Sequence, residues 1–177
     1  TIETLNVLIE AKKLDCKIIA FSNGGQMEKY CKKESIDFRR ILKVHSPRAS
    51  FVSFLFGMLK ELESILPINK NEILEAINEL KKIREFISSK NLNQTNIAID
   101  LANEIKEIPI IYYPWGLQAA SIRFKNSLQE NSKIHVITED IIEASHNGIV
   151  AWKNKDIKKP ILIQGKDDFI KTKERWN

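Results

Sequence analysis

A run of apolar residues ending in a glycine turn limits the folds open to this chain more than any other feature. Residues 16–21 read C-K-I-I-A-F and are followed by Ser22-Asn23-Gly24-Gly25. A short, nearly continuous apolar strand is typical of a parallel sheet buried on both faces. Amphipathic patterns predict a helix before it, over residues 2–14, and another after it, over residues 26–34. This order indicates an α/β fold with right-handed crossovers and helices on both faces of the sheet.

The following residues continue the alternation of strands and helices. Residues 38–44 predict a second strand, and Ser46-Pro47-Arg48 suits the start of a long helix, with Ser46 as N-cap and Pro47 in the first turn. Further helices are expected over residues 71–88 and 96–106.

A new strand with its own helix then indicates a second α/β unit. Residues 108–116 read as a buried strand ending in a loop, with Tyr112, Tyr113 and Trp115 as strand end and core, and residues 117–129 as the helix that follows. Residues 159–164 are expected to form a later strand. We therefore expect a first domain with a helical extension in residues 1–95 and the start of a second in residues 96–177.

Composition narrows the class of protein. Hydrophobic residues make up 43% of the 177 positions, enough for a core, and no apolar run approaches the roughly 20 residues of a membrane span. The net charge of +5 is scattered along the chain, which argues against a nucleic-acid partner and suits an anionic small substrate. Cys16 and Cys31 lack metal-ligand spacing and read as reduced thiols of a cytoplasmic protein. The chain opens with Thr1 directly on an expected helix, as if starting in the middle of it, so we expect a fragment or ordered portion of a longer protein.

Two polar segments hold residues that move protons near neutral pH. Gln129-Glu130-Asn131 carries a carboxylate, and Ser145-His146-Asn147 carries an imidazole. Taken alone the pair is a weak signal, because a glutamate near a helix end is usually a surface residue and a lone histidine is usually structural. His45 and His135 have no comparable setting and are read as structural or exposed.

These segments and others resemble one family in the same order. The chain is similar to the archaeal and bacterial bifunctional phosphoglucose/phosphomannose isomerases, which are built from two sugar isomerase (SIS) domains. The matching segments are residues 129–131 with Lys133, residues 142–150 with Trp152, residues 1–5, residues 22–25, residues 46–49, and residues 96–98 with Leu101-Ala102. The similarity covers nearly all of the chain and implies doubly wound parallel sheets flanked by helices.

The resemblance implies an aldose–ketose isomerase. It would interconvert glucose 6-phosphate, and mannose 6-phosphate, with fructose 6-phosphate through a cis-enediol. Glu130 would carry the proton between the two carbons, and His146 would open the sugar ring. In the family this histidine reaches the site from the neighbouring subunit, which implies a homodimer.

The resemblance also implies a set of substrate-binding residues. Arg48, at a helix start after Pro47, would face the enediolate, and Thr1 would supply a hydroxyl of the phosphate loop. The remaining members line the site: Ser22, Gly24 and Gly25. No metal-ligand cluster and no nucleotide-binding motif is recognised in the sequence, so neither a metal nor a cofactor is expected.

Departures from the family pattern leave a rival hypothesis open. Gln129 replaces an asparagine, and Gly148 stands where the family often has glutamate. The serines and glycine of the phosphate loop would precede Thr1, and the family's C-terminal lysine would follow residue 177, since Lys171 and Lys173 read as a solvated helix face. The rival is a non-catalytic SIS module that binds a sugar phosphate as a regulator or sensor. A weaker one is the isomerase half of an amidotransferase.

Overall fold

The structure, a computed structural model, describes residues 1–92, 95–153 and 160–175, with Pro47 described in its backbone alone. The chain divides into two compact units, Thr1–Leu74 and Glu75–Asn177, and each is described by itself. The division falls within helix α4 (Lys70–Phe86). No helix in the described ranges combines the length and the apolar character needed to cross a bilayer.

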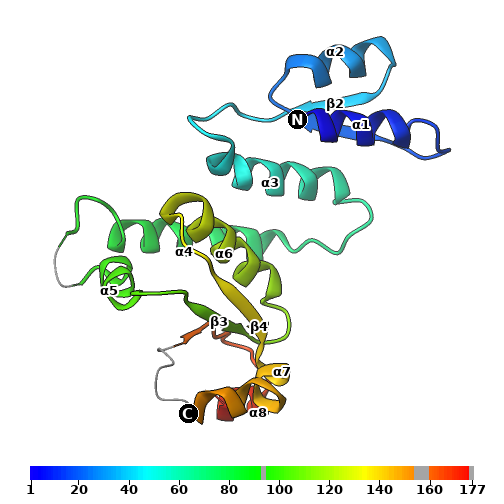
Figure 1. Cartoon of the computed structure of the whole chain (residues 1–177). Coiled ribbons are helices and arrows are strands. Elements are labelled where there is room, and N and C mark those ends of the chain that lie inside the picture. Colours follow the sequence, from blue (N-terminus) through cyan, green and yellow to red (C-terminus); the bar gives the residue numbers. More distant parts are fainter. Residues whose placement is uncertain (93–94, 154–159, 176–177) are drawn as a thin grey trace. The chain divides into compact units, whose positions relative to one another are not determined.

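The first unit is built on a two-stranded parallel sheet (Figure 1). Ser22, the last residue of the first strand, lies opposite Arg40, the last residue of the second. In chain order the elements are α1 (Ile2–Ala11), β1 (Ile19–Ser22), α2 (Gly25–Lys33), β2 (Asp37–Arg40), the 3-10 helix η1 (Pro47–Ser50), α3 (Phe51–Leu62) and the beginning of α4.

Helices cover both faces of this sheet. On one face, Ala20 of β1 is buried together with Leu8 of α1 and Cys31 of α2. On the other face, α3 comes close at Gly57, where an added Cβ would lie 3.5 Å from a Phe21 ring atom and 3.4 Å from Ile41 Cδ1. The parallel α/β fold predicted from the apolar strand and its glycine turn is confirmed.

Both strands of the first unit are shorter at one end than the sequence predicts. β1 begins at Ile19 rather than at residue 16, and β2 covers Asp37–Arg40 rather than residues 38–44. A strand lasts only as long as its neighbour pairs with it, and the last ladder bond runs from the Ile41 amide to the Ser22 carbonyl, 2.8 Å apart. The apolar residues beyond Ile41 therefore continue as a loop.

The helix predicted from Ser46 begins differently. Residues 47–50 form a 3-10 turn, and the Ser46 side chain makes no capping hydrogen bond. The Ala49 amide instead donates to the Ser46 carbonyl at 3.1 Å, a bond across three residues that tightens the first turn. The α-helix itself starts at Phe51.

The second unit contains a three-stranded parallel sheet in the order β4-β3-β5. Besides the rest of α4, its elements are α5 (Ile97–Glu104), β3 (Ile110–Tyr113), α6 (Gln118–Ser132), β4 (Ile137–Asp140), α7 (Ile141–His146), the 3-10 helix η2 (Gly148–Lys153), β5 (Ile161–Leu162) and α8 (Ile170–Arg175). Asn96 caps α5 by accepting from the amides of Ala98 and Ile99, which confirms the helix predicted there.

The two faces of this sheet carry different helices. Tyr112 of β3 packs with Ile141 and Ala144 of α7, and its hydroxyl accepts a 3.0 Å hydrogen bond from Nε1 of Trp152 in η2. Ile111 points to the other face and is fully buried. α6 packs against β3 and β4, and Figure 1 shows α6 and α7 on opposite sides of these strands.

Two features of the second unit differ from expectation. Strand β4, I-T-E-D, was not predicted, because two acidic residues in four hide its pairing with β3. Trp115 was expected near the core but is 91% exposed. The chain turns at Gly116, whose φ of 86° is open mainly to glycine, and so carries the indole away from the sheet. Tyr112 is buried as predicted, and Lys171 and Lys173 are exposed on α8 as predicted.

Candidate functional site

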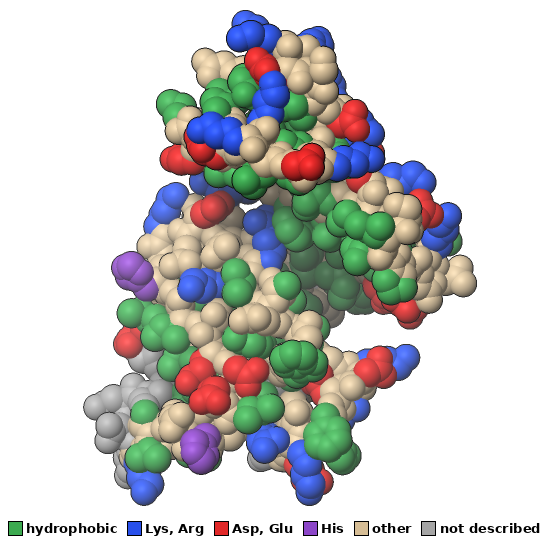
Figure 2. Space-filling view, turned by 90° about the vertical axis from the view of Figure 1, so that its right-hand side faces the viewer, with side chains coloured by type: hydrophobic (Ala, Val, Ile, Leu, Met, Phe, Trp, Pro, Cys, Tyr) green, Lys and Arg blue, Asp and Glu red, His purple; other side chains and the backbone are tan. Residues whose placement is uncertain are grey.

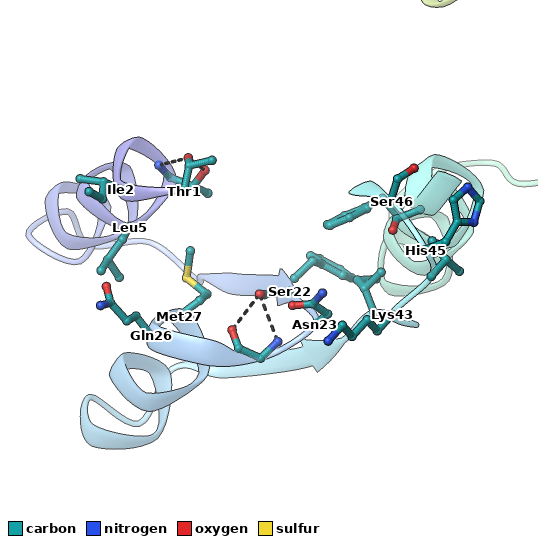
Figure 3. Close-up of a pocket in the computed structure, with 17 residues that line it drawn as sticks. Thr1, Ile2, Leu5, Ser22, Asn23, Gln26, Met27, Lys43, His45 and Ser46 are labelled. Atoms are coloured by element: carbon teal, nitrogen blue, oxygen red, sulfur yellow. Dashed lines mark hydrogen bonds between the residues drawn. The ribbon is translucent and has the colours of Figure 1, made fainter. Parts of the chain in front are cut away.

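The first unit holds a pocket of about 810 Å³ at the carboxyl ends of its two strands. It is lined by the end of β1 and the turn after it, by the first turn of α1, and by the loop after β2 (Figure 3). The loop contributes Ile41 and residues 43–46, and Ser50 and Phe54 also line the pocket. Ligands of open α/β sheets bind at this edge, and pockets of a few hundred to a thousand Å³ suit small molecules. Three of the predicted binding residues, Thr1, Ser22 and Gly24, line this one pocket.

A tight turn forms the wall after β1. Gly24 has φ 131° and ψ −145°, and Gly25 has φ 74°, so both occupy backbone conformations that favour glycine. Ser22 Oγ accepts from the Gly24 amide at 3.3 Å and donates to the Gly24 carbonyl at 3.1 Å. Helix α2 begins at Gly25 without a side-chain cap on its first amides. Uncapped amides at a helix start attract anions.

The start of α1 forms another wall. Thr1 is the N-cap: its Oγ1 accepts from the Thr4 amide at 3.3 Å and shares a 2.9 Å hydrogen bond with the Thr4 hydroxyl. Thr1 and Ser22 thus bring two hydroxyl groups to the pocket from different elements (Figure 3).

Several lining residues were not predicted as site residues. Asn23 and Gln26 come from the turn and from α2, and Lys43 and His45 from the loop after β2. His45 is exposed, one of the two outcomes expected for it, and it also lines the pocket. The signal for Asn23, Lys43 and His45 was their position shortly after the two strands, where α/β ligands bind. Lys43 adds a cation suited to an anionic ligand.

Three predicted binding residues are not placed in this pocket. Gly25 and Arg48 do not line it, and Arg48 lies exposed on η1. The side chain of Pro47 lies outside what the structure describes.

A network of charges holds the turn from outside. Arg40 Nη1 donates to the Asn23 carbonyl at 2.9 Å, and Nη2 donates to Glu28 Oε1 at 2.6 Å. Lys32 also pairs with Glu28, at 2.9 Å. Hydrogen bonds from Lys32 and from Arg40 lower the pKa of Glu28 below its usual value. Glu28 therefore stays a carboxylate throughout the neutral range.

The proposed base and ring-opening residue both lie in the second unit. Glu130 is exposed in the last turn of α6, and His146 is exposed as the last residue of α7. These helices cover opposite faces of the sheet (Figure 1). A helix is about 10 Å across, so a sheet between two helices holds their axes on the order of 20 Å apart. Within one chain the two side chains therefore belong to helices on opposite faces of the sheet.

The described residues contain no group of three or more His, Cys, Asp or Glu side chains that could hold a metal ion. The expectation that the protein works without a metal stays a prediction.

Comparison with known proteins finds similarity to one kind of enzyme. Residues 94–177 match the family model described as "Bacterial phospho-glucose isomerase C-terminal SIS domain". A bifunctional phosphoglucose/phosphomannose isomerase of Caldicellulosiruptor bescii is 31% identical over 87% of this chain and 47% of its own length. Along most of its length the chain is similar to bifunctional phosphoglucose/phosphomannose isomerases.

Two further relatives carry the same name. The enzyme of the same name from Aquifex aeolicus is 26% identical over 89% of this chain and 46% of its own length. The one from Pyrobaculum calidifontis is 27% identical over 84% of this chain and 44% of its own length. The chain therefore spans about half the length of the relatives it matches, and its fold is that of the SIS domains.

Proposed function

We propose that the protein is an aldose–ketose isomerase that interconverts glucose 6-phosphate, and mannose 6-phosphate, with fructose 6-phosphate. The observation that carries the proposal is the similarity to three bifunctional phosphoglucose/phosphomannose isomerases along most of the chain. The pocket supports it, because Thr1, Ser22 and Gly24 share one cavity of a size that suits a sugar phosphate.

Isomerisation moves one proton between neighbouring carbons through a cis-enediol. Glu130 is the proposed base that takes the proton from one carbon and returns it to the other. A carboxylate suits this work when its pKa approaches the working pH, which partial burial by a bound sugar would promote. His146 is proposed to pass a proton between the ring oxygen and the C1 hydroxyl, because an imidazole both donates and accepts near pH 7.

The binding residues divide between the phosphate and the sugar. Thr1 and the first amides of α2 are proposed to bind anionic oxygens, aided by Lys43. Arg48 is proposed to stabilise the enediolate; because it lies on η1 outside the pocket, it would have to turn toward the sugar. Gly25 and Pro47 are proposed to shape the backbone beside the bound sugar.

We propose further that the active form is a homodimer. Glu130 and His146 lie on helices that cover opposite faces of one sheet, and this placement favours a site that takes them from two chains. If both act in the reaction, they come from two subunits. A cytoplasmic location belongs to the same proposal and agrees with the free thiols of Cys16 and Cys31.

The test is turnover of the full-length protein. Coupled assays without added metal should detect fructose 6-phosphate formed from each hexose phosphate. Glu130→Gln should abolish turnover while fructose 6-phosphate still binds, whereas Glu79→Gln, an exposed partner of Lys82 on α4, should not change turnover. Unchanged turnover in Glu130→Gln would contradict the base assignment.

The histidine needs its own comparison. His146→Ala should slow cyclic substrates far more than an open-chain one, and His135→Ala, also exposed, should slow neither. Equal losses on both substrate forms would contradict ring opening. Tight binding of fructose 6-phosphate by a wild-type protein without any turnover would favour the sensor instead.

A further inference from the structure

The Arg40 side chain braces the turn at the edge of the pocket without lining the pocket. Arg40 pairs with Ser22 in the β1–β2 register, so the strand places it beside the first residue of the turn. Its Nη1 donates to the Asn23 carbonyl at 2.9 Å. Arg40 is not among the residues that line the cavity, so any effect on a ligand passes through the turn.

The same guanidinium also holds the start of helix α2. Nη2 donates to Glu28 Oε1 at 2.6 Å, and Lys32, one helical turn later, pairs with the same carboxylate. A guanidinium is planar and presents its donors in a fixed fork, which a lysine ammonium does not. The two Arg40 bonds therefore fix the turn and the helix at a set separation.

The peptide between Asn23 and Gly24 passes this restraint to the pocket. In a trans peptide the carbonyl and the following N–H point in opposite directions. The Asn23 carbonyl binds Arg40, and the Gly24 N–H binds Ser22 Oγ at 3.3 Å. Orienting the carbonyl from outside thus orients the N–H that holds the Ser22 hydroxyl, and Ser22 lines the pocket.

Arg40 and Glu28 can approach the turn this closely because position 24 is a glycine. Gly24 adopts φ 131° and ψ −145°, a region sparsely populated by residues other than glycine. A Cβ at position 24 would lie 3.2 Å from Arg40 Nη1 and 3.2 Å from Glu28 Oε2. The paired side chains of Arg40 and Glu28, the brace of the turn, therefore pack closely against the backbone of Gly24.

We propose that Arg40 is a positioning residue for the sugar-phosphate site. Together with Glu28 it holds the Asn23–Gly24 peptide so that Ser22 and the first amides of α2 keep their places in the pocket wall. This inference rests on the proposed function, which supplies the ligand.

The test compares Arg40→Met with Arg39→Met in the full-length protein. Arg39 precedes Arg40 and pairs instead with Glu61 of α3, at 2.5 Å, so its replacement removes the same charge from the same strand and leaves the turn intact. In Arg40→Met the Gly24 amide should exchange with solvent faster, and KM for fructose 6-phosphate should rise about three- to tenfold with kcat little changed. Arg40→Lys should recover only part of the loss, because it lacks the fork. Arg39→Met should keep the wild-type KM and Gly24 exchange.

Each contrary result overturns a definite part of the proposal. Unchanged exchange of the Gly24 amide in Arg40→Met would overturn the brace, whatever the ligand. Faster exchange with an unchanged KM would overturn its link to the pocket. An equal rise of KM in Arg39→Met would show a general loss of positive charge instead of positioning. A wild-type protein that binds no fructose 6-phosphate would overturn the proposed function, while the exchange measurement would still decide whether the brace exists.

Discussion

Replacing Gly24 by alanine tests the account of the turn through its energy. At φ 131° and ψ −145° any residue with a Cβ is strained, at a cost of about 1–3 kcal/mol. The added methyl would also meet Arg40 Nη1 and Glu28 Oε2, both at 3.2 Å. Both atoms are the far ends of side chains, which can shift by a few tenths of an ångström, so the backbone supplies most of the expected loss. We expect Gly24→Ala to destabilise the first unit by about 2 kcal/mol.

Gly57 provides a matched control in the same unit. It lies within α3, and its added Cβ would make ordinary contacts with Ile41 and Phe21, at 3.4 Å and more. Alanine in a helix is favoured over glycine by about 0.5–1 kcal/mol. Gly57→Ala should therefore leave stability unchanged or slightly raise it.

The assay must report on the first unit. The three tryptophans, at positions 115, 152 and 176, all lie after residue 74, so tryptophan fluorescence follows the second unit. Urea unfolding followed by amide exchange at residues of β1 and α2 reports the first unit directly. Equal stability of Gly24→Ala and Gly57→Ala would show that residue 24 does not adopt the backbone conformation described above.

Two further predictions concern the rest of the chain. Tyr112→Phe removes the acceptor of the half-buried Trp152 N–H and should destabilise the second unit by about 1 kcal/mol. The loss should appear as a lower urea midpoint in unfolding followed by tryptophan fluorescence. An unchanged midpoint would mean that this hydrogen bond does not contribute to stability. Hydrogen bonds from Lys60 and Lys70 lower the pKa of Glu63 to about 2, so the stabilisation by this carboxylate should be fully present above pH 4.5 and lost as the pH falls toward 2. An NMR titration of the Glu63 carboxyl with its midpoint near 4.5 would disprove that pairing.

The order of elements was predictable from the sequence where local signals agree. The apolar residues 18–21, the glycine pair and the flanking amphipathic helices all indicate the same α/β unit. The two predictions that failed in the second unit, for β4 and for Trp115, have physical causes. β4 is defined by its pairing with β3, which lies 27 residues earlier in register, and its own residues are polar. Trp115 leaves the sheet because of the backbone at Gly116, which no hydropathy pattern records.

The site was predictable to the extent that it follows the strands. Thr1, Ser22 and Gly24 were predicted by resemblance to the family, and they share a pocket because two parallel strands end side by side. Lys43 and His45 follow the second strand in the same way but form no motif. The hydrogen bond from Arg40 to the Asn23 carbonyl depends on the strand register, which sets Arg40 opposite Ser22. This register cannot be predicted from the sequence.

The separation of the proposed base and histidine could not be predicted either. Glu130 and His146 are sixteen positions apart in the sequence, and this spacing does not reveal that a sheet lies between their helices. Their placement on opposite faces of the sheet is the reason for proposing a second subunit.

Mixing two inactive variants tests this claim most directly. Full-length Glu130→Gln and His146→Ala chains, each carrying a different purification tag, can be produced together and the hybrid dimer isolated through both tags. If each site takes its glutamate from one subunit and its histidine from the other, one site of the hybrid has both residues intact, and the hybrid should recover about half of the wild-type turnover. A hybrid as inactive as its two parents would contradict the shared site.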